Sequence, residues 1–233
     1  MQKIIFTKLG DYFIPPEYYP KPSKKVLPEW YKNHKPYAAE KPKEIIDGQI
    51  TSTIKKCMPV FDVLTSGYII PTFQDISVTR NDDLINFQTV TNAWSLEYHS
   101  SKQFQGHPHA ANLYGAPKWI SPWSIRTPKG YSCLFINPVH NSNPYTTIFE
   151  GIVDTDEYFN SVNYPFVLKD LKFEGIIPAG TPLVQVIPFK RDEWKMEQGT
   201  EKDLQEAAKN FGKLKSVFYE GYKKFFWSAK SFD

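Results

Sequence analysis

Between about residues 50 and 190 the chain is a series of short β-prone runs separated by proline, glycine and asparagine. In residues 76–80 and 85–89 apolar and polar side chains alternate with the period of half-buried antiparallel strands. Many short strands with frequent turns, and no alternation of strand and helix patterns, predict a mainly β fold with an antiparallel jelly-roll or sandwich body. The predicted strands cover residues 67–70, 75–80, 84–90, 119–125, 131–136, 146–154, 164–168, 173–177 and 183–189, and residues 57–64 are predicted as a short helix.

Residues 1–48 have the composition of an irregular arm. Residues 3–8 are β-prone, but prolines then recur, and each one fixes the backbone and removes an amide donor. Aromatic side chains between the prolines are costly to leave in water, so we expect the arm to wrap over its own body or to lie along another subunit. The prolines are Pro15, Pro16, Pro20, Pro22, Pro28, Pro36 and Pro42, and the aromatic residues are Tyr12, Phe13, Tyr18, Tyr19, Trp30, Tyr31 and Tyr37.

Residues 200–228 contain no proline and have a helical pattern. Thr200 is suited to cap the helix, with Asp203 as its third residue. Apolar side chains then recur with the spacing of one helix face, which predicts one long helix or two. We therefore expect an extended arm over residues 1–48, a β-sandwich domain over 49–195 and a helical segment over 196–233 packed on it. The stripe comprises Leu204, Ala207, Ala208, Phe211, Leu214, Lys215, Phe218, Tyr222, Phe225 and Phe226.

Composition narrows the class of protein further. No apolar run reaches the roughly 18 residues that span a bilayer, and the first residues are too polar for a signal peptide. Two cysteines, Cys57 and Cys133, cannot make a disulfide framework or a zinc site alone. The net charge is +3, and only Arg80, Arg126 and Arg191 are arginine, which does not favour a nucleic-acid reader. We expect a cytoplasmic protein with no membrane segment and no nucleic-acid partner.

One pair of histidines has the spacing of a metal motif. His107-Pro108-His109, with the later Pro178-Ala179-Gly180 turn, is partly similar to the cupins. That family adds a glutamate after its first motif and a histidine after its second, and this chain has neither. Because a first-row metal needs three or four nitrogen or oxygen ligands, two histidines predict an ordinary loop, no functional metal and no cofactor.

Two segments resemble the trimeric dUTPases. Residues 151–158, Gly-Ile-Val-Asp-Thr-Asp-Glu-Tyr, and residues 180–187, Gly-Thr-Pro-Leu-Val-Gln-Val-Ile, are similar in sequence and separation to two motifs of that family. The resemblance implies that Asp154 orients an attacking water and that Tyr158 stacks beneath a deoxyribose. However, Arg126-Thr127-Pro128 stands where the family has Arg-Ser-Gly, and a helix replaces its glycine-rich C-terminal arm. We expect a shared jelly-roll fold without shared chemistry.

A third resemblance extends over residues 118–191. Five motifs occur in the order seen in a domain-of-unknown-function family of bacteria and tailed phages. They lie at residues 125–131, 137–138, 149–156, 177–182 and 186–191. Members of that family show Phe-Arg-Thr-Pro-Pro-Gly-Trp, Gly-Ile-Val-Glu-Thr-Asp-Trp and Lys-Gly-Glu-Pro. The resemblance implies no activity, but it favours a virus or its host as the source.

The candidate site residues are Arg126, Asp154, Asp156 and Tyr158. Asp154 and Asp156 are two residues apart, so in a strand they would share one side and could bind a cation or Arg126. Two interpretations remain open, a small-molecule pocket and a structural ion pair. Because a bidentate arginine–carboxylate pair between strands is the commoner outcome, we predict that Arg126 pairs with Asp154 or Asp156 as a strut.

Two function classes follow from these patterns. The first is a non-enzymatic structural or interaction protein of phage origin, an assembly or virion component located in the host cytoplasm or the virion. The aromatic arm and the apolar helix favour it, and they predict self-association or a place in a larger assembly. The alternative is a jelly-roll enzyme or small-molecule binder that resembles dUTPase or dCTP deaminase. No complete catalytic set is present, so no catalytic residue is predicted.

Overall fold

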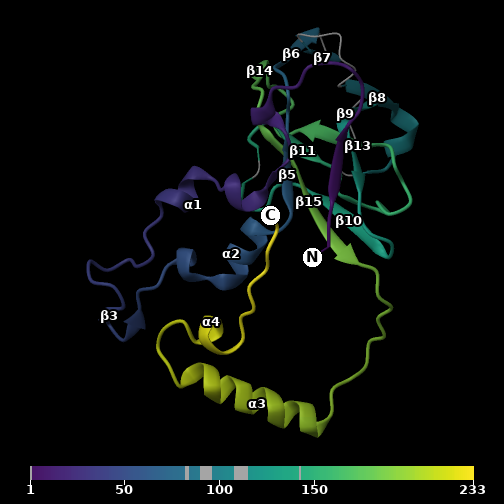
Figure 1. The fold of residues 1–233 in the computed structure, drawn as a ribbon. Coiled ribbons are helices and arrows are strands. Elements are labelled where there is room, and N and C mark those ends of the chain that lie inside the picture. The colour runs from purple at the N-terminus through teal and green to yellow at the C-terminus, as the bar shows by residue number, and fades with distance from the viewer. Residues whose placement is uncertain (1, 82–83, 90–95, 108–114, 142) are drawn as a thin grey trace. The chain divides into compact units, whose positions relative to one another are not determined.

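The computed structural model describes residues 2–81, 84–89, 96–107, 115–141 and 143–233 (Figure 1). The chain divides into two compact units. Residues 1–26 and 67–191 form the first, which we call the β unit, and residues 27–66 and 192–233 form the second, the helical unit. These boundaries differ from the predicted arm, body and tail. Each unit is described by itself.

Two sheets of five strands dominate the described part of the β unit (Figure 1). In both sheets every pair of neighbouring strands is antiparallel. The first sheet has the order β1 (Ile5–Lys8), β9 (Gly115–Arg126), β13 (Ser161–Leu168) and β11 (Thr146–Ile148), and β8 (Leu96–Ser100) also pairs with β9. The second has the order β12 (Gly151–Val153), β10 (Tyr131–Ile136), β15 (Pro182–Lys190), β5 (Tyr68–Pro71) and β2 (Lys21–Pro22).

A smaller antiparallel sheet contains β14 (Gly175–Ile177), β6 (Ile76–Asn81) and β7 (Leu84–Thr89). The predicted mainly β, antiparallel fold class is confirmed, with a helix near the C-terminus of the chain. The predicted alternation is visible in β6, where Ile76 and Val78 are buried and Thr79 is exposed. The jelly-roll topology stays a prediction. Single 3-10 turns lie at Pro16–Tyr18, Ser23–Lys25, Ile54–Lys56 and Ser101–Phe104.

Side chains from the sheets share one hydrophobic core. Phe135 of β10 in one sheet contacts Tyr164 of β13 in the other, with ring centroids 5.7 Å apart. Trp119 of β9 stacks on Phe166 at 4.8 Å. The core therefore joins the two larger sheets as in a sandwich. Its buried members are Ile14, Ile70, Ile76, Val78, Trp119, Trp123, Ile125, Cys133, Phe135, Ile148, Val162, Tyr164, Phe166, Leu168, Ile177, Leu183, Val184 and Val186.

The first 26 residues belong to the β unit and pack on its sheets. Residues 3–8 were predicted to be β-prone, and β1 pairs there with β9. Ile14 is buried in the core, and Tyr12 stacks on Phe73 at 5.8 Å. Proline does not prevent pairing at the sheet edge, because β2 is an edge strand and its Pro22 is opposite Tyr68 of β5.

The helical unit brings together two distant stretches of sequence. Tyr219 donates a hydrogen bond to the carbonyl of Glu44 at 2.5 Å, and Trp227 Nε1 donates to Asp62 at 3.0 Å. Thr200 and Asp203 form the predicted cap, with Thr200 Oγ1 and Asp203 Oδ2 2.6 Å apart. The described elements are α1 (Glu29–Asn33), the hairpin of β3 (Ile45–Ile46) and β4 (Gln49–Ile50), α2 (Met58–Thr65), α3 (Glu201–Lys215) and α4 (Gly221–Phe225). Residues 200–228, which were expected to form one long helix or two, thus contain two helices.

Substitution of Gly67 tests the close packing of β5 against β15. Its φ is +67°, and a Cβ atom there would lie 2.0 Å from the Val186 carbonyl oxygen. We expect Gly67→Ala to cost about 3 kcal/mol or more, since positive φ and a backbone clash add. Gly130→Ala, with φ +84° but open space, should cost about 1–2 kcal/mol. Gly151→Ala, which meets neither problem, should stay within about 0.5 kcal/mol. Urea unfolding measures all three, and equal costs would contradict this packing.

Candidate functional site

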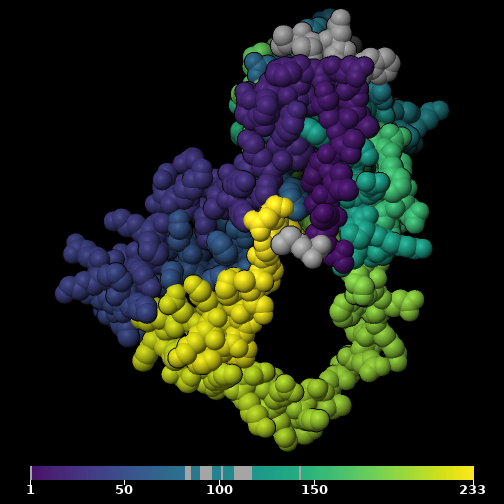
Figure 2. All heavy atoms as spheres, in the orientation of Figure 1, coloured from purple at the N-terminus to yellow at the C-terminus, as the bar shows by residue number. Residues whose placement is uncertain are grey.

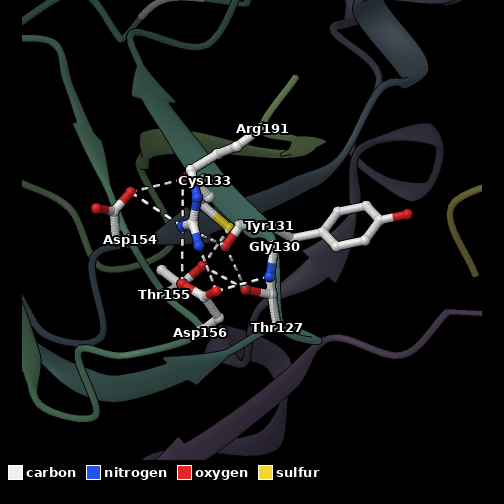
Figure 3. Close-up of polar contacts among 9 residues, drawn as sticks. Thr127, Gly130, Tyr131, Cys133, Asp154, Thr155, Asp156 and Arg191 are labelled. Carbon is white, nitrogen blue, oxygen red and sulfur yellow. Dashed lines mark hydrogen bonds and ion pairs between the residues drawn. The ribbon is translucent and has the colours of Figure 1, made fainter. Parts of the chain in front are cut away.

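Asp154 and Asp156 lie where three neighbouring strands of the second sheet begin or end. β10 lies between β12 and β15, with Cys133 opposite Val153 and Tyr131 opposite Lys190. Because both pairs are antiparallel, the turn before β10, the turn after β12 and the residue after β15 meet at one end of the sheet. This places residues 127–130, residues 154–156 and Arg191 together (Figure 3).

Arg191 makes the central contacts of this group (Figure 3). Its Nη1 is 2.8 Å from Asp156 Oδ1, and its Nη2 is 2.5 Å from Asp156 Oδ2. Nη1 also lies 3.1 Å from Asp154 Oδ1 and 2.9 Å from Ser132 Oγ. The Asp156 side chain is only 1% exposed, whereas that of Asp154 is 62% exposed. The bidentate pair with Asp156 is therefore the buried part of the contact, and Asp154 is its solvent-exposed flank.

The backbone fixes the same carboxylate from another direction. The amide of Gly130 donates to Asp156 Oδ2 at 2.7 Å. The hydrogen bonds from Arg191, with a further contribution from this amide, lower the pKa of Asp156 from 3.8 to about 2. Asp156 thus stays ionised over the ordinary pH range. A carboxylate with so low a pKa is a poor general acid or base near neutrality.

The predicted partner of these carboxylates was Arg126, and that prediction is wrong. Arg126 ends β9 in the other sheet, opposite Ile5 of β1, and its side chain is exposed. Its guanidinium lies over the ring of Phe159, 5.7 Å from the centroid. Arg191 takes the predicted role, because it follows the strand that pairs directly with β10. The order of strands in the sheet, which the sequence pattern does not reveal, decides between the two arginines.

A series of buried, hydrogen-bonded side chains leads from this ion pair toward the core. Thr127 Oγ1 and Thr155 Oγ1 are 2.7 Å apart, and Thr155 Oγ1 donates to Cys133 Sγ at 3.3 Å. All three residues are buried, and burial raises the pKa of the Cys133 thiol from 9.0 to about 11. A thiol that stays protonated is a weak nucleophile. Since Thr127 directly follows β9, these contacts link the first sheet to β10 and the turn after β12.

The hydrogen bond of Tyr158 is to a residue outside the Arg191 cluster. Its hydroxyl donates to the Ser161 carbonyl at 3.2 Å, and its side chain is about half exposed. Neither of the two cavities described below is lined by any of the four predicted site residues. Among the predicted residues, the structure brings together Asp154 and Asp156 through Arg191. This arrangement can hold strand ends in place, and its geometry is that of a strut.

The histidine pair is only partly covered by the structure. The ring of His107 packs edge-on against Phe149 at 4.6 Å, and His109 lies outside the described residues. Over the part of the chain that is described, no group of three or more histidine, cysteine, aspartate or glutamate side chains has the arrangement of a metal site.

A small cavity of about 20 Å³ lies inside the β unit. Its lining includes Trp119, Tyr164, Ser121 and Thr72. Trp119 Nε1 and the Tyr164 hydroxyl are buried and have no hydrogen-bond partner in the structure as described. Space of this size holds about one water molecule, which is the molecule that such donors ordinarily bind in protein interiors. The cavity is too small for a nucleotide.

A second cavity, of about 450 Å³, lies within the helical unit. Its walls combine apolar side chains of α2 and of the segment between α3 and α4, and three lysines and Glu220 also line it. Lys56 pairs with Glu220 at 2.6 Å. The residues that line this groove are Ile50, Lys56, Cys57, Met58, Pro59, Leu214, Lys215, Val217, Phe218, Glu220, Gly221, Tyr222 and Lys223.

Comparison of the chain with models of known protein families gives no match, and comparison with curated protein sequences gives none either. The helices within the described ranges are all too short or too polar to cross a bilayer.

Replacing Arg191 tests the strut directly. Arg191→Met leaves the buried Asp156 carboxylate without its cation, so we expect the melting temperature to fall by several degrees. Arg126→Met is the matched control, because it removes an arginine that lies outside the cluster, and it should change the melting temperature by about a degree at most. Differential scanning calorimetry measures both variants. Equal melting temperatures for the two would show that the cluster does not stabilise the fold.

The low pKa of Asp156 also predicts how stability depends on pH. A carboxyl whose pKa is lower in the folded chain contributes stability above its unfolded pKa, and that contribution is lost as the pH falls through the folded pKa. The stability difference between wild type and Asp156→Asn should be constant above about pH 5 and shrink between pH 3.8 and about 2. Urea unfolding across this range gives the difference. If it does not change down to pH 2, Asp156 is not held by an ion pair.

Proposed function

We propose that this chain is a non-enzymatic structural or interaction protein that joins a larger assembly through its helical unit. The observation that carries the proposal is the apolar face of α3. Each of the helix's 15 residues is exposed, including Leu204 at 64% and Phe211 at 61%. In Figure 2 the spheres of α3, in yellow-green, are uncovered on the face in view.

An uncovered amphipathic helix of this length needs a partner surface. Isolated helices shorter than about 12–15 residues are marginal in water, and longer ones gain most of their stability from packing of the apolar face. α3 has a cap and a regular apolar stripe, but it buries none of its side chains within the chain. A protein surface that covers Leu204 and Phe211 would supply the missing packing.

The groove next to α3 extends the same surface. Leu214 and Lys215 belong both to the helix and to the groove, and Phe218, at 75% exposure, lies just beyond. Exposed apolar surface that continues from a helix face into a groove is typical of sites that bind other proteins. Further large apolar side chains of the helical unit that are exposed are Trp30, Ile45, Ile46, Ile50, Ile54, Trp194, Met196, Tyr222 and Phe226.

The enzyme alternative receives less support from the β unit. Asp156 is engaged by Arg191 and Gly130, and the Tyr158 hydroxyl is engaged by Ser161. The two residues that the dUTPase resemblance would assign to water activation and sugar stacking, Asp154 and Tyr158, do not line either described cavity. The motif resemblance to the family of bacteria and tailed phages supports the more specific proposal of a phage assembly or virion component, located in the host cytoplasm or the virion.

The test is whether the native protein is isolated as an oligomer or in a complex. The full chain, isolated under gentle conditions from the cells that make it, should run as an oligomer or as a stoichiometric complex. Phe211→Asp should abolish this association, because it buries a charge at the interface. Asn210→Asp on the polar face of α3 is the control and should leave the association intact. A wild-type chain that stays a partner-free monomer up to about 200 µM would refute the proposal.

A further inference from the structure

We infer that the occupant of the α3 face is α3 of a second copy of this chain, packed antiparallel with its centre at Ala208. This inference rests on the proposed function and names its partner. The first ground is the position of the charges along the helix. Residues 201–207 contain three acidic residues and one lysine, whereas residues 208–215 contain three lysines and no acidic residue.

This distribution selects an antiparallel second copy. Residues seven positions apart lie on nearly the same face of an α-helix, so Glu201, Ala208 and Lys215 form one row. When two such helices cross antiparallel at Ala208, Glu201 of each copy lies opposite Lys215 of the other. A parallel pair would instead place Glu201 beside Glu201 and Lys215 beside Lys215, which is unfavourable. The helix is thus complementary in charge to its own reversed copy.

Side-chain size on this face shows the same self-complementarity. Leu204 and Phe211 flank Ala208 on the exposed stripe. In the antiparallel arrangement Leu204 faces Gly212 of the second copy, and Phe211 faces Gln205. A Cβ atom at Gly212 would meet nothing within 4 Å in the chain itself, so the space over this glycine is open. Because Leu204 is opposite a glycine and the central residue is an alanine, the two helices can approach closely at these positions.

The rest of the helical unit leaves this face available. Leu214, on the side of α3 toward α4, packs near Gly221, where a Cβ atom would lie 3.1 Å from Leu214 Cδ1. Lys213 lies over the rings of Phe225 and Phe226, at 5.1 and 5.8 Å. The α4 side of the helix therefore makes contacts within the unit, whereas Leu204 and Phe211, which flank Ala208, are the more exposed apolar side chains.

The length of α3 sets the expected affinity of the dimer. A 15-residue helix is about 22 Å long, so a pair of them buries well below the roughly 1,600 Å² of a standard interface. We therefore expect a reversible dimer that dissociates in the micromolar range. Light scattering from about 1 to about 200 µM should show the mass rising from that of one chain toward that of two.

Cysteine cross-linking tests the geometry. In a Cys57→Ser background, with Cys133 buried in the core, Ala208→Cys places one thiol from each copy at the symmetry axis. Mild oxidation should then give a disulfide-linked dimer. Lys215→Cys lies in the same row, but the two introduced thiols would be about 20 Å apart, so it should give none. Mixing Glu201→Cys with Lys215→Cys should give a cross-linked heterodimer. Circular dichroism checks that each variant keeps its helices.

Each outcome decides between the proposals. No cross-link from Ala208→Cys, or equal cross-linking from Lys215→Cys, overturns the antiparallel pair. If the native protein still associates and loses that association in Phe211→Asp, the proposed function stands and a different protein covers α3. A partner-free monomer that does not cross-link at any of these positions refutes both.

Discussion

Arg191 and Asp156 form an ion pair at the one place where the ends of β10, β12 and β15 meet, and the surrounding turns take their positions from it. The carboxylate also accepts the Gly130 amide, so the turn before β10 and the turn after β12 share one anchor. Hydrogen bonds among the buried side chains of Thr127, Thr155 and Cys133 extend from this turn to the core. A pair with one carboxylate this deeply buried is costly to break, because the remaining charge is left without its partner. The aspartates of the motif at residues 151–158 thus make structural contacts in this fold.

The two units differ in how they use their apolar side chains. In the β unit, tryptophans, tyrosines and aliphatic residues from the sheets complete one core, and the first 26 residues add Ile14 to it. In the helical unit, large apolar residues such as Leu204, Phe211 and Phe218 remain exposed. Exposed apolar area of this kind is typical of interaction surfaces, and for this reason we assign the proposed partner to the helical unit.

Local patterns in the sequence predicted much of this structure. The run at residues 131–136 is β10 with the predicted bounds, and Thr200 with Asp203 caps α3 as expected. Alternation predicts which side chains share a face, but it does not predict which strands are neighbours in the sheet. The order of the strands makes Arg191, and not Arg126, the partner of Asp156. The strand β8 was not predicted. The prolines of residues 1–26 indicated an irregular arm, and one short edge strand within it, β2, contains Pro22 and pairs with β5.

The central claim is that Arg191 and Asp156 act on each other, as a strut, and a double-mutant cycle tests it most directly. Unfolding free energies of wild type, Arg191→Met, Asp156→Asn and the double variant give the interaction between the two side chains. We expect strong coupling, with the double variant at least as stable as Arg191→Met alone, because the neutral asparagine no longer leaves a buried charge unpaired. Losses that simply add would contradict the account.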